Sequence, residues 1–89
     1  MSAAASILAP VHLLQLPRMR AAVVAGVDWN QLAVPEARRL RELGLDEGVE
    51  IELLHTSGLF GGPIACRIGR MTVALRRHVA RAIHVSPAG

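Results

Sequence analysis

The sequence is poor in several residue types that define large classes of proteins. Its single cysteine, Cys66, excludes an internal disulfide and a cysteine-rich zinc site. Only Trp29 and Phe60 are aromatic, so the chain is poorly equipped to stack nucleic-acid bases. No apolar run approaches the roughly 18 to 20 residues that span a bilayer, and the apolar start lacks the charged residues of a secretory signal. We therefore expect a soluble cytoplasmic protein with no membrane span and no nucleic-acid partner.

The sequence also lacks a recognisable catalytic constellation. The glycine-rich segment 58–62 is not followed by the Lys-Ser/Thr pair and helix of a phosphate-binding loop. Ser57 has no histidine and carboxylate at a motif spacing. Cys66 alternates with Ile64 and Ile68, which is typical of a small core residue rather than a nucleophile. We predict that the chain is not an enzyme.

Acidic residues are missing from the C-terminal part of the chain, residues 53–89. All seven acids lie between Asp28 and Glu52, whereas residues 53–89 hold five arginines and no acid. Lysine is absent, so all ten cationic side chains are arginines and the net charge is +3. This distribution predicts a basic face that could approach anionic lipid headgroups, nucleic acid or an acidic protein. The scarcity of aromatics leads us to rank a protein partner first.

Eighty-nine residues, of which 52% are hydrophobic, predict one small domain with its own core. Apolar residues alternate with polar ones in several short runs, and the longest apolar run has the Ala and Val content of a buried strand. The predicted strands span residues 20–27, 49–53, 64–68, 71–75 and 83–85. The predicted helices span residues 35–43 and, as a single turn, residues 76–81.

The junction between the helix and the next strand has a strong local signature. Leu40 and Leu43 share one helical face, Val34 and Ala37 are predicted to face inward with them, and Gly44 stands where a left-handed residue ends a helix. Leu45 would then pack back on Leu40, as in a Schellman cap. Gly48 is predicted to take a positive φ in the polar turn that follows.

Five short strands, one inserted α-helix and a one-turn helix before the last strand predict a mainly β fold, a small barrel. Closure would pair the last strand with the first, which hides an edge. Three leucines after the N-terminal extension are expected to cover one end of the barrel: Leu13, Leu14 and Leu16. The pattern alone does not separate an SH3-like from an OB-like barrel.

The ordered set of these segments resembles a known family. The runs RLRELGL, DEG and VEIELL, followed by LFGGPIACRIGRMTVALRR and ARAIHV, are similar to ferrous iron transport protein A, the FeoA family. The similarity runs from about His12 to Val85, and the family often has glycine at or beside Met19. It implies an SH3-like barrel over residues 12–86, preceded by a loose extension over 1–11 and followed by a tail over 87–89.

The resemblance also implies a function. FeoA-like proteins are cytosolic accessories of the ferrous iron permease FeoB, a membrane protein with a GTP-binding domain, so we expect docking onto that domain. The partner-contact candidates are Leu45, Leu59, Phe60, Gly61, Gly62, Pro63, Arg76 and Arg77, while Gly44 and Gly48 are interpreted as structural turns. The alternatives are a metal-responsive regulatory module of the same fold and a basic nucleic-acid-binding module. A homodimer is a further candidate assembly.

No cofactor is required for this function, but the family is associated with transition metals. Imidazole and carboxylate groups suit zinc and ferrous iron. Glu52 and His84 are predicted to point outward on strands beside the first strand, and His12 lies near its start. The metal-ligand candidates, at a surface site or a subunit contact, are Glu52, His55, His84 and His12.

Overall fold

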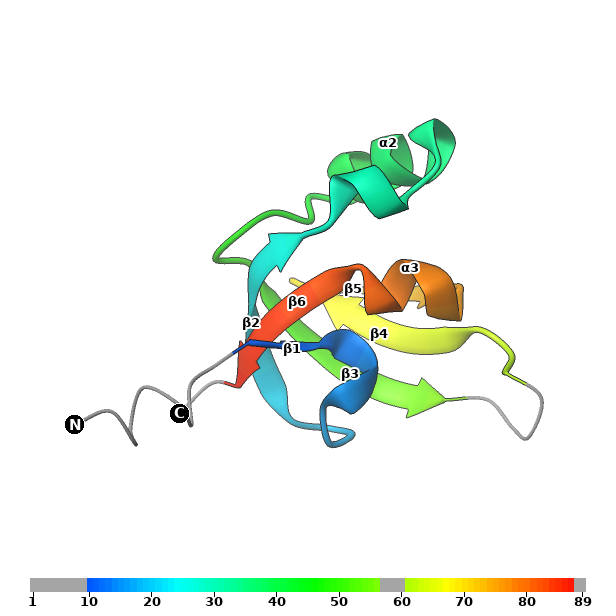
Figure 1. Ribbon diagram of the computed structural model, residues 1–89. Coiled ribbons are helices and arrows are strands. Elements are labelled where there is room, and N and C mark those ends of the chain that lie inside the picture. The colour runs from blue at the N-terminus through cyan, green and yellow to red at the C-terminus, as the bar shows by residue number, and fades with distance from the viewer. Residues whose placement is uncertain (1–9, 57–60, 88–89) are drawn as a thin grey trace.

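The computed structural model describes residues 10–56 and 61–87, and its main feature is one strongly curved antiparallel sheet (Figure 1). The order of its six strands is β1-β6-β2-β3-β4-β5. The strands are β1 (Val11–His12), β2 (Ala21–Val27), β3 (Glu50–Thr56), β4 (Ile64–Ile68), β5 (Met71–Leu75) and β6 (Ile83–Pro87). The helices are η1 (Leu13–Gln15), η2 (Trp29–Gln31), α2 (Val34–Glu42) and α3 (Arg77–Arg81). No helix among the described residues is long and apolar enough to cross a membrane.

The predicted mainly β fold with five strands, one inserted helix and a one-turn helix is confirmed. The last strand pairs with the first predicted one, because β6 runs antiparallel to β2. The sheet extends slightly beyond the predicted domain, since Val11 pairs with Val85 and β6 continues to Pro87. Strand β1 is not among the predicted strands because two residues are too few to show an alternating pattern.

Two irregularities bend the sheet into a barrel. The pairing register shifts between Val24 and Gly26 on β2, and again between Leu53 and His55 on β3. Such bulges increase the local twist and turn a strand toward a new direction. The second bulge also explains why the alternation used to predict the strand at residues 49–53 ends early, although β3 continues to Thr56.

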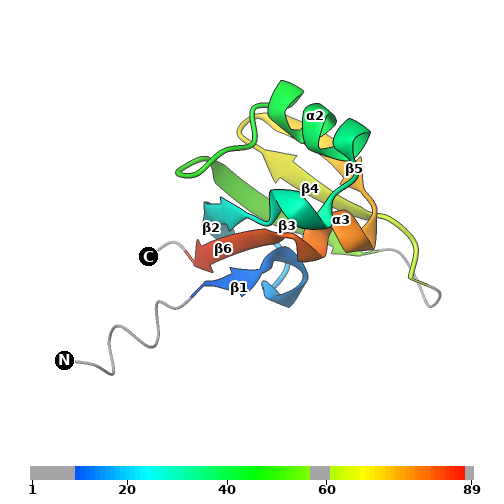
Figure 2. The same cartoon turned by 45° about the horizontal axis from the view of Figure 1, so that its top comes forward.

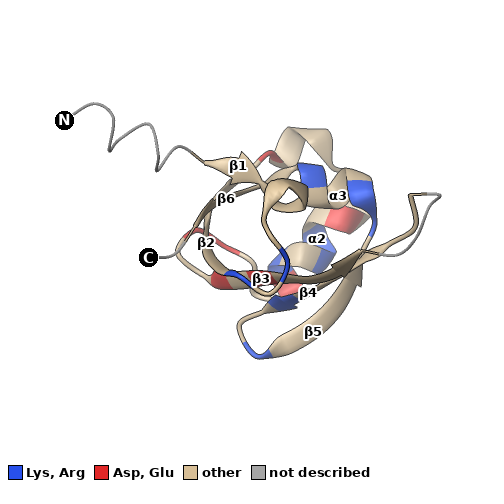
Figure 3. Cartoon of the chain, turned by 90° about the horizontal axis from the view of Figure 1, so that it is seen from below, with Lys and Arg blue, Asp and Glu red and all other residues tan. Residues whose placement is uncertain are grey.

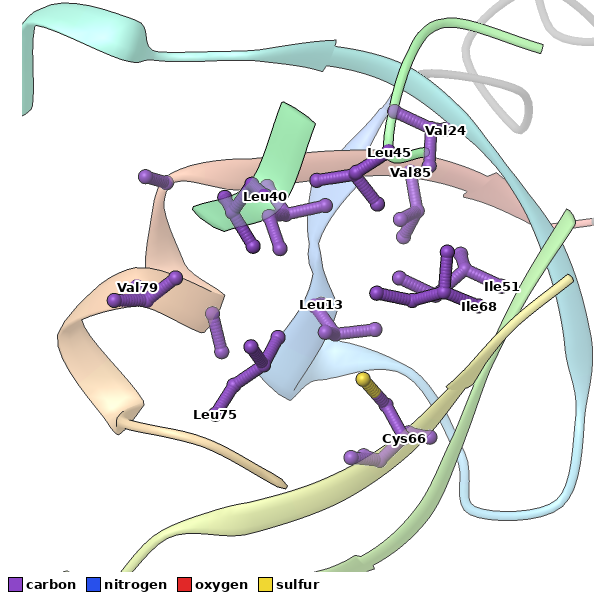
Figure 4. Packing of buried hydrophobic residues seen from close by; sticks show 14 of the residues in the cluster. Leu13, Val24, Leu40, Leu45, Ile51, Cys66, Ile68, Leu75, Val79 and Val85 are labelled. Carbon is purple, nitrogen blue, oxygen red and sulfur yellow. The ribbon is translucent and has the colours of Figure 1, made fainter. Parts of the chain in front are cut away.

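The core fills the inside of the curved sheet, with the helices covering its ends (Figure 4). Strand β4 shows the pattern clearly, because Ile64, Cys66 and Ile68 are buried while the residues between them are partly exposed. Leu13 and Leu16, which flank or lie in η1, are buried at one end as expected. Ten of the largest fully buried side chains are Leu13, Leu40, Leu45, Ile51, Leu53, Ile64, Ile83, Val24, Val85 and Cys66.

Helix α2 starts one residue earlier than predicted. Ala33 precedes the helix, and its backbone N–H donates to Oε1 of Glu36 at 3.0 Å. This contact satisfies one of the free N–H groups of a helix start. Ala37 and Leu40 face the core as predicted, but Val34 is 71% exposed. Its predicted inward orientation is wrong because the helix covers the core only from its second turn onward.

The end of α2 has the geometry of a Schellman motif. Gly44 has φ of 85°, its N–H donates to the carbonyl of Arg41, and the N–H of Leu45 donates to the carbonyl of Leu40, both at 3.0 Å. These are the two hydrogen bonds that define the motif. Leu40 and Leu45 are both buried and lie together in the core (Figure 4). The chain therefore reverses at Gly44 and returns to the sheet, and Gly48 follows with φ of 86°.

The cap provides a stability prediction with a matched control. Gly44→Ala places a Cβ in the left-handed region and should lower the free energy of unfolding by about 1 kcal/mol, which lowers Tm by about 4–8 °C. Gly26→Ala makes the same chemical change where φ is not left-handed and where no atom lies within 4 Å of the new Cβ. Its stability should be unchanged or raised by up to about 1 kcal/mol. Equal denaturation midpoints for the two variants would contradict this account.

Candidate functional site

A groove lies between α2 on one side and the end of the edge strand β5 with the start of α3 on the other. Figure 2 shows the arrangement of α2, β5 and α3. Its volume is about 320 Å³. Helix α2 forms one wall, whereas the end of β5 and the residues after it form the other. The lining residues are Pro35, Glu36, Arg39, Leu40, Ala74, Leu75, Arg76 and Val79. The groove exists because α2, inserted between β2 and β3, is held over the sheet by its second half.

A histidine–carboxylate contact joins α2 to α3 beside the groove. Nε2 of His78 on α3 lies 2.5 Å from Oε2 of Glu36 on α2, while Oε1 of Glu36 accepts from the N–H of Ala33. The hydrogen bond from Ala33, and next that from His78, hold the pKa of the Glu36 carboxyl below its usual range. The contact joins α2 directly to α3, so it helps to set the width of the groove.

The remaining charges on the groove are positive. Arg39 and Arg76 both line it, and the single lining carboxylate, Glu36, already accepts two hydrogen bonds. The floor is apolar, with Leu40, Leu75 and Val79. The described residues that line the groove include no serine, threonine, cysteine or histidine. It can hold an apolar side chain beside an acidic group of another molecule.

The structure places the predicted partner-contact residues in different surroundings. Arg76 lies on the groove, as described above. Arg77 turns away from it, because its Nε donates to the carbonyl oxygen of Gly62 at 3.0 Å. A Cβ on Gly61 would lie 3.7 Å from the Arg77 side chain, so this arginine covers the end of the loop before β4. Gly61 and Pro63 are exposed beside it.

Three of the predicted contact residues are not available at the surface that the structure describes. Leu45 is only 2% exposed and belongs to the core, so its side chain is not available to a partner and that prediction is wrong. The other prediction for this leucine, that it packs on Leu40 in a Schellman cap, is the one that the structure confirms. Leu59 and Phe60 lie outside the described residues, and their predicted role stays a prediction.

Sequence reasoning missed the contribution of α2 to the groove. Arg39 is not among the predicted site residues, although it lines the groove beside Leu40, which faces the core. Glu36 did carry a signal, because an acidic residue at the third position after a helix start often bonds back to the preceding N–H. Arg41, on the same helix, does not line the groove. Its guanidinium group stacks over the ring of Trp29, 4.2 Å from the ring centroid.

The four metal-ligand candidates do not form one site. His12 and His84 are opposite each other on β1 and β6, but Nε2 of His84 lies 2.7 Å from Oδ2 of Asp28. Glu52 forms an ion pair with Arg67 on β4, and His55 is exposed on β3. Across residues 10–56 and 61–87, no three histidine, cysteine, aspartate or glutamate side chains gather to hold a metal ion.

The five arginines of residues 53–89 differ in whether their side chains have a partner. Figure 3 shows basic segments on α2, on α3 and at the turn before β5. Arg67 is paired with Glu52, and Arg77 bonds to Gly62. Arg70, Arg76 and Arg81 are exposed. The predicted basic face therefore reduces to separate positions, of which Arg70 and Arg76 flank β5.

Comparisons with known proteins find the same fold in a family of related proteins. A family model described as the FeoA domain matches residues 11–87. FeoA of Stenotrophomonas maltophilia, an SH3 domain protein solved with zinc, is 34% identical, with a TM-score of 0.69 over 84% of this chain and 88% of that one. Iron(II) transport protein A of Clostridium thermocellum is 26% identical, with a TM-score of 0.75. That comparison covers 89% of this chain but only 46% of the other, so this chain spans about half its length.

The fold is also found in another class of protein. A manganese-dependent transcriptional repressor has a TM-score of 0.74 and 22% identity over 89% of this chain and 42% of its own, a likeness of fold alone. The search of curated proteins finds no match.

The curved sheet, the inserted helix and these neighbours define an SH3-like β-barrel, which settles the choice that the pattern alone left open. The chain belongs to the FeoA domain family, whose members are associated with ferrous iron transport. The resemblance expected from the sequence is confirmed.

The Glu36–His78 contact predicts a pH-dependent stability. Since the pKa of Glu36 is lowered in the folded chain from its ordinary value of 4.5, its carboxylate stabilises the fold above that value. The contribution disappears as the pH falls through the folded value. The unfolding free energies of the wild type and Glu36→Gln should therefore differ most near neutral pH and converge in acid. Glu42→Gln removes a charge from the exposed face of the same helix as a control, and a pH-independent Glu36→Gln difference would contradict the assignment.

The buried thiol predicts an unreactive cysteine. Cys66 is 0% exposed, and burial raises its pKa from 9.0 to about 12. At pH 8 the folded chain should react with iodoacetamide at least about a hundredfold more slowly than the chain unfolded in urea, because thiolate is the reacting species. Mass spectrometry measures the rate of alkylation at Cys66 directly, since the sequence has one cysteine. Comparable rates in both states would contradict the placement of Cys66.

Proposed function

We propose that the chain is a non-enzymatic accessory of ferrous iron uptake that acts in the cytoplasm by docking onto the GTP-binding domain of a FeoB-type permease. The observation that carries this proposal is membership of the FeoA family over residues 11–87. The Stenotrophomonas maltophilia relative is itself described as a candidate activating factor of ferrous iron transport. The geometry supports docking, because a groove with an apolar floor and two lining arginines suits a protein segment.

The proposed role does not depend on a resident metal. Among the described residues the candidate ligands are divided among several places on the sheet, so they do not form one shared site. Because the Stenotrophomonas maltophilia relative was solved with zinc, we retain the hypothesis of a surface metal site in this chain. His12 or His84 would bind Fe(II) or Zn there, and solvent or a second subunit would complete the coordination. Metal titration of His12→Ala and His84→Ala tests it.

A binding experiment tests the docking proposal. The purified cytoplasmic GTP-binding domain of the cognate permease is immobilised, and the whole chain is passed over it with GDP or a GTP analogue. The wild type should bind, and Arg39→Glu combined with Arg76→Glu should weaken binding at least about tenfold, because two positive charges at the groove become negative. Arg18→Glu reverses a charge outside the groove and should change affinity less than about twofold.

The opposite results would discriminate among the alternatives. Absence of binding in every nucleotide state, with and without ferrous iron, would contradict the proposal. Binding of the wild type to duplex DNA with a steep salt dependence would instead support a nucleic-acid-binding module.

A further inference from the structure

Strand β5 is an unprotected edge. It stands last in the strand order, so one of its sides pairs with β4 and its other side has no strand neighbour among the described residues. Natural edge strands are usually protected by charges, prolines or bulges. The five residues Met71–Leu75 contain none of these, and Met71, Thr72 and Ala74 are exposed. An edge of this composition is suited to accept another strand.

The register shows which backbone groups face outward. The N–H of Gly69 donates to the carbonyl of Glu50, so the alternation of antiparallel bonds makes Ile68, Cys66 and Ile64 the residues of β4 that bond to β5. Their partners are Met71, Val73 and Leu75. Thr72 and Ala74 therefore direct their N–H and C=O groups to the open edge, where an added strand would bond to them.

The groove described above continues this edge. Ala74 and Leu75 belong both to β5 and to the groove wall that faces α2. A strand added to β5 would extend the sheet beneath α2, and alternate side chains of that strand would point toward the apolar floor near Leu40. The edge supplies backbone hydrogen bonds, whereas the groove supplies a place for side chains, which together are the two components of β-augmentation.

The charges at the ends of β5 indicate what kind of strand would fit. Arg70 lies in the turn just before β5, Arg76 directly follows it, and Arg39 lines the groove. Within the described residues, none of these three arginines forms an ion pair, because the three ion pairs involve Arg67, His78 and His84. Acidic residues at both ends of an incoming strand would therefore be stabilised.

The same charges disfavour a second copy of this chain. Two β5 strands paired antiparallel around Val73 would place Arg70 of each copy opposite Arg76 of the other, which is a repulsive arrangement at both ends. No acidic residue lies within β5 or next to it in the sequence, and Glu36, across the groove from Arg76, already accepts a hydrogen bond from Ala33 and contacts His78. The occupant favoured by this edge is a different protein.

We propose that β5 binds an extended segment of a partner protein as an additional strand, with apolar residues at alternate positions and acidic residues at both ends. The inference rests on the proposed function, because it identifies how the docking partner is held. It assigns recognition to the outward N–H and C=O groups of Thr72 and Ala74, to the groove floor, and to Arg70 and Arg76.

A peptide experiment tests the inference without the permease. The probe is a synthetic peptide of sequence DEVTVTVED with blocked ends, added to the isotopically labelled chain and followed by NMR. We expect the amide shifts to be largest at Thr72 and Ala74, and the peptide KKVTVTVKK to bind at least about tenfold more weakly. Equal affinity for both peptides, or shifts that avoid β5, would overturn the inference.

A pair of variants at one position isolates the backbone contribution. Thr72→Pro removes an N–H that the sheet does not use, which an edge strand tolerates, and should weaken binding at least about tenfold. Thr72→Val keeps the N–H and should bind within about twofold of the wild type. If Thr72→Pro proves unfolded by circular dichroism, Arg70→Glu, which leaves the backbone intact, should weaken binding of the acidic peptide and improve binding of the basic one. Unchanged preferences in Arg70→Glu would overturn the inference.

The outcome is separable from that of the proposed function. If the permease domain binds the wild type and Thr72→Pro equally well, the permease docks elsewhere and the strand-addition inference fails while the proposed function stands. If the permease domain does not bind at all, the proposed function fails, and the peptide result alone decides the inference. Shifts at Thr72 and Ala74 that grow with protein concentration before peptide is added would show self-association and overturn the choice of occupant.

Discussion

The structure depends on the reversal of the chain at Gly44. Strands β2 and β3 pair directly, yet the chain between them builds η2 and α2, so it must leave the sheet and return to it. The two hydrogen bonds of the Schellman motif stop α2, and Leu45 inserts next to Leu40 in the core. This single turn determines where α2 lies, and the position of α2 determines the groove. The left-handed φ at Gly44 is thus connected, through packing, to the proposed binding surface.

Charged side chains have two effects on this structure. Two histidine–carboxylate contacts hold the inserted segment to the barrel: Asp28, just before η2, contacts His84 on β6, and Glu36, in the first turn of α2, contacts His78 on α3. These contacts engage acids of the segment 28–52, which holds all seven acids of the chain, as the Glu52–Arg67 pair also does. Among the described residues, Arg70 and Arg76 beside β5 form no ion pair at contact distance, although Arg76 attracts Glu36 across the groove, so the surface there is positive. The uneven distribution of charge along the chain is therefore the basis of the proposed preference of β5 for acidic segments of a partner.

Much of the fold could be predicted from the sequence because its signals are local. Alternation located the core residues of β4, and Gly44 with Leu45 located the end of α2. The bulge on β3 was invisible, since an extra residue breaks the alternation without leaving a compositional mark. The orientation of Val34 was misjudged, because periodicity cannot show how much of a helix covers the core.

The candidate site was harder to predict because it is made by elements far apart in the chain. Arg76 was named in advance, whereas Arg39 joins it only because α2 is brought over the end of β5. The metal-ligand candidates show the same limitation. The sequence indicated which strands are neighbours, but it did not show that Asp28 would contact His84 or that Arg67 would pair with Glu52. A motif search could not have found the exposed edge either, since its signal is the absence of charge and proline from β5.

The central claim is that the chain works by docking through β5 and the adjoining groove. Amide hydrogen exchange of the whole chain, measured with and without the cytoplasmic GTP-binding domain of the permease, tests it most directly. The account predicts slower exchange at Thr72 and Ala74, whose N–H groups are open in the free chain, with little change along β1. Protection confined to β1 and β6, with Thr72 and Ala74 exchanging as in the free chain, would contradict it.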